Sequence, residues 1–369
     1  MKFFRLSLPL ALALTGAALA QPTLTVHEWG TFTCLQDEKG RAIGRINSDD
    51  EPVPAFVHDI GHLIADTTPQ SPPSKGLPPS LVAVNMRLET PVIYFHLPPG
   101  TTKMRADVEV GFRGGWLSQF YPKAEAETPG LQEIYSDKAP SSKTLGKLRW
   151  KGLTIEGHKS GPKCKDAVWN APRQAKAESV RTGAGETEQF LFYRGVGHLD
   201  SPVTTKTDST GRVEVSARLP LKHLWLADIR PGGASYAHVA DVKTKNLDLP
   251  TSPSAPKLAQ LKKEMKAALI EDGLYPDEAQ AMLDAWQKSY FESPGLRIFF
   301  LVPQSWTDQV LPLTIKTEGP VKVKRVMIGR VELISREQRK ILDASKRGDV
   351  SGIAKLGRFS HALLRDVGR

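Results

Sequence analysis

The chain has 369 residues, of which 40% are hydrophobic and 24% charged, and its formal net charge at pH 7 is +10. This composition is that of a globular protein and excludes the disordered and fibrous classes, while two cysteines are too few for a disulfide-rich scaffold or a four-thiolate metal site. The basic excess permits an acidic partner without requiring one.

Residues 1–20 have the pattern of a secretory signal peptide. Lys2 and Arg5 form its positive start, an apolar run follows over residues 6–14, and residues 18–20, Ala-Leu-Ala, supply a small-residue cleavage site. The run is shorter than the about 20 apolar residues that a membrane span needs. We therefore expect a mature protein that begins at Gln21, lacks a transmembrane segment and is periplasmic or secreted.

Residues 21–250 are predicted to be rich in strands. Residues 24–35 carry β-branched and aromatic side chains at a period of two, which is typical of a strand. Residues 81–97 and 103–112 predict further strands, with a break at Pro91, because proline cannot donate to a ladder. Shorter candidates follow at residues 146–156, 188–196, 212–219 and 223–229. Many short strands separated by turns favour a β-sandwich or a related layered sheet.

The composition changes near residue 250, where a mixed region, residues 251–369, begins. Leu258, Leu261 and Met265 lie on one helical stripe, and a second helix starts near Pro276, which together predict a helical hairpin. Strand patterns then resume at 295–302, 311–316 and 321–334, and helical patterns close the chain at 336–346 and 350–365. We predict a mainly β, α+β fold with sandwich-like layers, in which this region can continue the sheet of residues 21–250.

Four stretches of the chain resemble a family of uncharacterised exported bacterial proteins whose first strand has a similar His-Glu-Trp-Gly-Thr-Phe-Thr motif. They are residues 27–33, HEWGTFT; 86–95, MRLETPVIYF; 306–313, WTDQVLPL; and 326–332, VMIGRVE. The resemblance spans most of the mature chain and implies an exported location. No activity is established for that family, so it implies no mechanism and no site residue.

Glu28 is the first candidate for chemistry, because it lies on the otherwise apolar face of its strand. A buried carboxylate must be paired, hydrogen-bonded or protonated. One hypothesis makes Glu28 and Glu89 a catalytic acid and base, with His27 or His96 assisting proton transfer. The favoured alternative is a structural ion pair between Glu28 and Arg87 that fixes the strand register.

Three arginines could bind an anionic group in the catalytic hypothesis. Arg87 shares a strand face with Glu89, and Arg113 and Arg194 lie near strand ends. An arginine side chain supplies both hydrogen-bond donors and a fixed positive charge.

Two weaker patterns concern metals. His58 and His62 are four residues apart and would share a face if they were helical, although the glutamate of a zinc-protease motif is replaced by Asp59. Asp49 and Asp50, in an acidic run near a predicted hairpin, are candidate calcium ligands, but their spacing is not that of an EF-hand loop. Exposed histidines and solvated turn carboxylates are the favoured interpretation, so no cofactor is predicted, with zinc and calcium as minor alternatives.

Cys34 and Cys164 are predicted to form one disulfide, because an exported protein meets an oxidising compartment. The alternative is two separate thiols, with Cys34 buried on its strand.

The most basic part of the chain is its end, from Lys316 to Arg347, which permits an anionic envelope partner, although a solvated face is the favoured interpretation. Nucleic acid is not expected for an exported protein. Since no hydrolase elbow, P-loop or dinucleotide motif is present, we predict a non-catalytic envelope binding or structural module. The alternative is a hydrolase that acts on an extracellular or envelope substrate through carboxylate and histidine acid–base chemistry.

Overall fold

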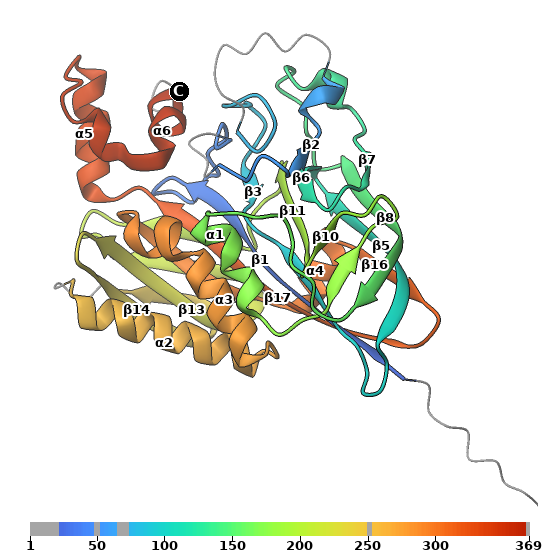
Figure 1. Ribbon diagram of the computed structural model, residues 1–369. Helices are drawn as coiled ribbons and strands as arrows, with labels where there is room; N and C mark the ends of the chain where they lie inside the picture. Colours follow the sequence, from blue (N-terminus) through green and yellow to red (C-terminus); the bar gives the residue numbers. More distant parts are fainter. Residues whose placement is uncertain (1–21, 48–51, 65–73, 249–252, 367–369) are drawn as a thin grey trace, which may run out of the picture.

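The structure is a computed structural model that describes residues 22–47, 52–64, 74–248 and 253–366 (Figure 1). Seventeen described strands are linked by hydrogen bonds into one large, mixed and strongly bent sheet. Helices cover parts of it, so the predicted mainly β, α+β class is confirmed. No helix of the described segments combines the length and the apolar character that a membrane crossing demands.

The strand β1 (Leu24–Gln36) lies at the centre of the sheet. It runs parallel to β17 (Val321–Leu333) along its whole length and antiparallel to β3 (Met86–Leu88) and β4 (Val92–His96). The predicted break at Pro91 separates β3 from β4. A Cβ atom on Gly30 would lie 2.9 Å from Cα of Pro91, so the glycine of the HEWGTFT motif permits this close approach.

The pairing of β1 with β17 joins the two sequence regions into one sheet across residue 250. Beyond β17 the sheet continues through β15 (Gly295–Val302) to β13 (Val213–Arg230), which also pairs with β14 (Gly233–Leu247) and β12 (Val203–Thr207). The strands expected at 212–219 and 223–229 are a single strand, β13, whose register with β14 shifts between Ser216 and Leu221. A recess lies beside this shift.

On the other side of β1, the strand β11 (Leu191–Gly197) pairs with β3, β4 and β6 (Gly115–Tyr121). The sheet then bends into β8 (Leu145–Glu156) and β5 (Lys103–Arg113), which pair with each other. Its remaining strands are β2 (His58–Asp59), β7 (Glu125–Glu127), β9 (Ser179–Arg181), β10 (Thr187–Glu188) and β16 (Leu313–Thr317).

The predicted helical hairpin is present as α2 (Ala255–Glu271) and α3 (Pro276–Ala285), followed by a π-helical turn (Gln287–Glu292). Ser254 caps α2, and Gly273, with a φ of 113°, ends it in a conformation that favours glycine. Figure 1 shows the hairpin against β13 and β14. Its apolar side packs on the sheet face that carries Trp29, Val326 and Phe299.

The opposite face of the sheet encloses the larger apolar core, to which Val26, Phe32 and Met327 contribute. The C-terminal helices α5 (Arg336–Lys346) and α6 (Ser360–Asp366) close this side. The short helices are α1 (Ala167–Asn170), α4 (Gln304–Val310) and 3-10 turns at Gly61–Leu63, Leu131–Glu133, Pro172–Gln174 and Ile353–Phe359. Thus β1 lies between two cores, and its two faces carry different candidate residues.

Candidate functional site

Glu28 is fully buried and paired with Arg325 rather than Arg87. The two residues are direct partners in the parallel register of β1 and β17, and Arg325 Nε donates to Glu28 Oε2 at 2.5 Å. The hydroxyl of Tyr193 donates to Glu28 Oε1 at 2.6 Å. Burial, reinforced by the Glu28 charge, raises the pKa of Tyr193 well above its usual value, so this tyrosine stays a donor. The structure therefore contains an ion pair at Glu28, as expected, but with Arg325 in place of Arg87. The sequence could not distinguish between these two arginines.

Glu89 belongs to a second buried network. Lys75 Nζ donates to Glu89 Oε2 at 2.9 Å, and Arg87 Nε lies 3.5 Å from Oε1. Burial would raise the pKa of Glu89, but Arg87 and then Lys75 outweigh it and hold the pKa well below its usual value. Glu28 and Glu89 therefore belong to separate ion-paired networks.

The three arginines expected to bind an anion are not equivalent. Arg87 and Arg194 are buried on the neighbouring strands β3 and β11, and Arg194 Nε donates to the backbone oxygen of Glu89 at 2.7 Å. Arg113, at the end of β5, is exposed. The first two therefore share the Glu89 network, whereas Arg113 is a surface residue.

A further buried network was not predicted from the sequence. Arg297 Nε lies 3.1 Å from Glu332 Oε1, and Arg330 also pairs with Glu332. The guanidinium of Arg330 stacks over the Tyr290 ring at 4.2 Å, and both arginines are buried. The sequence marked Arg330 only as part of a basic terminal region, because its burial depends on the sheet and the π-helical turn meeting there.

His27 and His96 do converge, on the helical side of the sheet. His27 lies in β1 and His96 at the end of β4, in a register that pairs His27 with Tyr94 and Thr25 with His96. Their ring centroids are 5.2 Å apart. Both rings contact Glu278, with 2.8 Å between His27 Nδ1 and Oε2 and 2.8 Å between His96 Nε2 and Oε1. Glu278 was absent from the sequence prediction.

Glu278 is positioned by the start of α3. It occupies the third helical position, where its carboxylate accepts the Tyr275 backbone N–H at 2.8 Å, and it is 1% exposed. Burial would raise the pKa of Glu278, but the hydrogen bonds from His27 and His96 outweigh it and lower the pKa. A glutamate at the third position of a helix is typical of helix capping, so the local sequence carries no sign of its contact with the β1 histidine.

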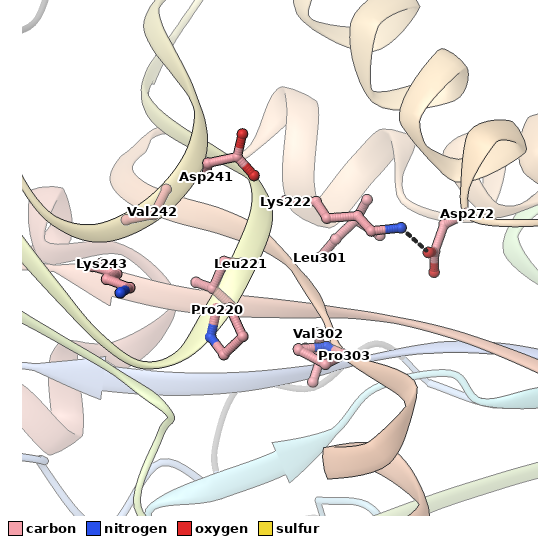
Figure 2. A pocket seen from close by; sticks show the side chains of 10 residues that line it. All are labelled: Pro220, Leu221, Lys222, Asp241, Val242, Lys243, Asp272, Leu301, Val302 and Pro303. Atoms are coloured by element: carbon pink, nitrogen blue, oxygen red, sulfur yellow. Dashed lines mark ion pairs between the residues drawn. The ribbon is translucent and has the colours of Figure 1, made fainter.

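The register shift of β13 leaves a recess with a volume of about 460 Å³ between β13, β14 and the ends of α2 and β15 (Figure 2). Leu221, Val242 and Leu301 give it apolar walls. Lys222 forms an ion pair with Asp272 over 3.7 Å at its rim, as the dashed line in Figure 2 marks. Asp241 has a φ of 54°, which matches the disturbed backbone at the shift. No sequence pattern predicted this recess, because it depends on strand register.

The proposed histidine pair of residues 58 and 62 does not form a helical metal motif. His58 is in the strand β2 and His62 in a 3-10 turn, so the spacing of four does not place them on one helix face. His58 Nε2 instead contacts Glu186 Oε1 at 2.8 Å. Asp49 and Asp50 lie outside the described residues.

The structure does not contain the predicted disulfide. Cys34 and Cys164 are both free thiols. Cys34 is buried in the larger core, whereas Cys164 packs against the helix-covered core on the other face of the sheet. The sheet therefore separates the two sulfurs. Burial, with a contribution from Asp200, raises the pKa of the Cys34 thiol.

The basic C-terminal residues do not form one surface. Arg325 and Arg330 are buried in ion pairs, and Arg339 binds Glu38 through two hydrogen bonds of 2.6 Å. Carboxylates within the protein compensate these three positive charges, which leaves fewer of them available to an anionic partner.

No family model matches the chain, and neither does any curated protein. Among solved structures, the chain is similar to the yeast delta-COP-I mu-homology domain complexed with a Dsl1 WxWxV peptide, at 9% identity and a TM-score of 0.28 over 85% of this chain and 98% of that one. It is also similar to the Fcho1 mu-homology domain of Danio rerio with a bound Eps15 peptide, at 9% identity and a TM-score of 0.26 over 85% and 95%.

Proposed function

We propose that this chain is an exported, non-catalytic binding module whose ligand occupies the recess beside the β13 register shift. One observation carries the proposal: the recess has a volume of about 460 Å³, apolar walls and charged groups at its rim. Small-molecule sites typically measure about 300–1,000 Å³ and combine an apolar lining with a few polar groups. Its charged lining residues are Lys222, Asp241, Lys243 and Asp272.

The state of the buried carboxylates supports binding over hydrolysis. A general acid or base must exchange a proton with a substrate, so it needs a group free to approach the reacting atoms. Glu28 is fully buried between Arg325 and Tyr193, and Glu89 is held by Lys75. These pairings favour structural roles for the two residues that the hydrolase hypothesis needs.

The ligand class follows from the walls and the rim. Leu221, Val242 and Leu301 suit an apolar body. Asp272 is shared by Lys222, at 3.7 Å, and Lys324, at 3.4 Å, so its charge is compensated within the protein. Lys243 is exposed at the rim and can meet an anionic group. Asp241 also lines the recess, so the anionic end of a ligand must lie closer to Lys243 than to Asp241. We propose a small amphiphilic anion bound in that orientation.

Anilinonaphthalene sulfonate, an aromatic anion, is a suitable probe. Its fluorescence should rise on binding to the wild-type protein, and Val242→Trp, which fills the recess, should abolish that rise. Lys243→Glu should weaken binding several-fold, because it reverses the rim charge. Lys245→Glu is the matched control, since Lys245 is an exposed lysine of β14 that does not line the recess. Equal binding by the wild type and Val242→Trp would contradict the proposal.

Export is a separate part of the proposal and rests on residues 1–20, which lie outside the described residues. N-terminal sequencing of the protein recovered from a bacterial periplasm or medium should begin at Gln21. A product that starts at Met1 and stays in the cytoplasm would contradict it.

A further inference from the structure

Glu278 differs from the other buried carboxylates of the described chain in the partners that it has. Glu28, Asp37, Glu89, Glu188 and Glu332 are also buried, and each forms an ion pair with an arginine or a lysine. Glu278 is 1% exposed, yet its ion-pair partners in the described segments are two histidines. A buried carboxylate needs compensating charge. An imidazole supplies it only when protonated, so a bound cation is an alternative source.

The three side chains present a metal-binding donor set. One nitrogen of His27, one nitrogen of His96 and a carboxylate oxygen of Glu278 all lie within 4.8 Å of one another. In a tetrahedral zinc site with ligand bonds of about 2.0–2.1 Å, the ligand atoms are about 3.3–3.4 Å apart. Small rotations of the rings would therefore admit an ion between groups that now contact each other directly.

The identity of the donors selects the class of ion. Imidazole nitrogen suits zinc and its neighbours among the divalent transition metals, whereas calcium and magnesium prefer sets made of oxygen alone. Three protein ligands also leave one position of a tetrahedral site for water.

The donors are held in place before any ion binds. His27 is in the most central strand, and its cross-strand partner is Tyr94. His96 lies two residues beyond Tyr94, on the same sheet face as His27's partner. Glu278 is fixed by the Tyr275 backbone N–H at 2.8 Å. Such supporting hydrogen bonds orient metal ligands and strengthen binding. The site thus ties the helical hairpin to β1 and β4.

The site also has a route to solvent. The Tyr275 ring lies over both imidazoles, with centroid distances of 4.6 Å to His27 and 4.9 Å to His96, and Tyr275 is 44% exposed. The side chain of His96 is 14% exposed. An ion can therefore reach the donors by displacement of one surface ring.

We propose that His27 Nδ1, His96 Nε2 and a carboxylate oxygen of Glu278 bind one zinc-class divalent transition-metal ion. This site is separate from the recess of the proposed function and from the predicted pair His58 and His62. The failure of either proposal leaves the other intact, because the two sites share no residue.

Calorimetric titration with Zn²⁺ tests the proposal on the mature protein, produced without a histidine tag and treated with a chelator. The wild type should bind one ion per chain, and Ca²⁺ and Mg²⁺ should not compete. His96→Ala and Glu278→Gln should each weaken Zn²⁺ binding by about 100-fold or more, because each removes a ligand. Circular dichroism establishes that these variants are folded, and Co²⁺ absorption provides a second measurement of the ligand set.

His223→Ala is the matched control. His223 and His238 form a stacked surface pair with 3.1 Å between Nδ1 and Nε2, so this variant removes a paired histidine away from the site. It should leave the affinity at the main site unchanged. The proposal is overturned if the wild type binds no stoichiometric Zn²⁺, or if His223→Ala weakens binding as much as His96→Ala does. In either case the three residues form a hydrogen-bonded structural contact.

Discussion

Glu28 and Arg325 face each other across the parallel strands β1 and β17, with 2.5 Å between Oε2 and Nε and almost no solvent contact for either side chain. The pair joins residues that are 297 positions apart. A one-residue slip of either strand would move one charge to the opposite face and leave both uncompensated. The ion pair thus specifies the register that unites the two regions of the chain.

Removal of one member of this pair should be strongly destabilising. We expect Arg325→Met to lower the free energy of unfolding by about 3–5 kcal/mol, because Glu28 remains as an uncompensated buried charge. The double variant Glu28→Met, Arg325→Met should recover part of the loss. Urea denaturation measures both values. Asp248→Asn, which breaks the exposed pair with Arg212, is the control and should leave the midpoint unchanged. Equal effects of the buried and exposed changes would refute a register role.

Acid should destabilise the protein through Glu332. Burial would raise the pKa of Glu332, but Arg297 and Arg330 outweigh it and lower the pKa. A lowered pKa in the folded state means that the stabilisation is present above the unfolded pKa of about 4.3 and is lost as the pH falls through the folded value.

We therefore expect the urea midpoint of the wild type to fall as the pH drops below about 4.5. Glu332→Gln should be less stable at pH 7, and its midpoint should depend less on pH in the acid range, because it has no carboxylate to protonate there. Glu318→Gln, a change outside this network, should retain the wild-type pH dependence. A Glu332→Gln profile parallel to that of the wild type would argue against this residue as a source of the acid sensitivity.

The two cysteines should differ in their reactivity toward a thiol reagent. Cys164 is partly exposed, whereas Cys34 is buried and its thiol has a raised pKa, so a reagent in solvent can reach Cys164 but not Cys34. Titration with an aromatic disulfide reagent should detect one thiol in the native protein and two in denaturant. Cys164→Ser should abolish the native reaction. The detection of no thiol in denaturant, without a reductant, would instead support a bridge.

A side chain at Gly30 should disturb the contact between β1 and the β3–β4 break. The added Cβ atom of Gly30→Ala would lie 2.9 Å from Cα of Pro91, so the backbone must shift. We expect a loss of about 1–3 kcal/mol in the free energy of unfolding, as for overpacking in a core. Gly183→Ala is the control, because no atom lies within 4 Å of its added Cβ. Thermal unfolding compares the two, and similar melting temperatures would show that this contact can relax.

Much of the local structure could be predicted from the sequence. Period-two patterns located β1, β4 and β17, Pro91 marked the end of a strand, and the hairpin helices followed from apolar spacing and from Pro276. These features depend on side-chain periodicity and backbone preference, which act over a few residues. The same locality explains why Glu28 was recognised as a candidate: it is a charged residue on an otherwise apolar strand face.

Only the tertiary structure decided the partners. Arg325 rather than Arg87 compensates Glu28, and Glu278 rather than a strand residue meets His27 and His96. The β13 register shift opens the recess, and the two faces of the sheet keep Cys34 and Cys164 apart. Length, composition and charge therefore indicated the class of protein, and period-two patterns indicated its strand content. The pairing of charges depends on contacts between residues hundreds of positions apart, which no local pattern encodes.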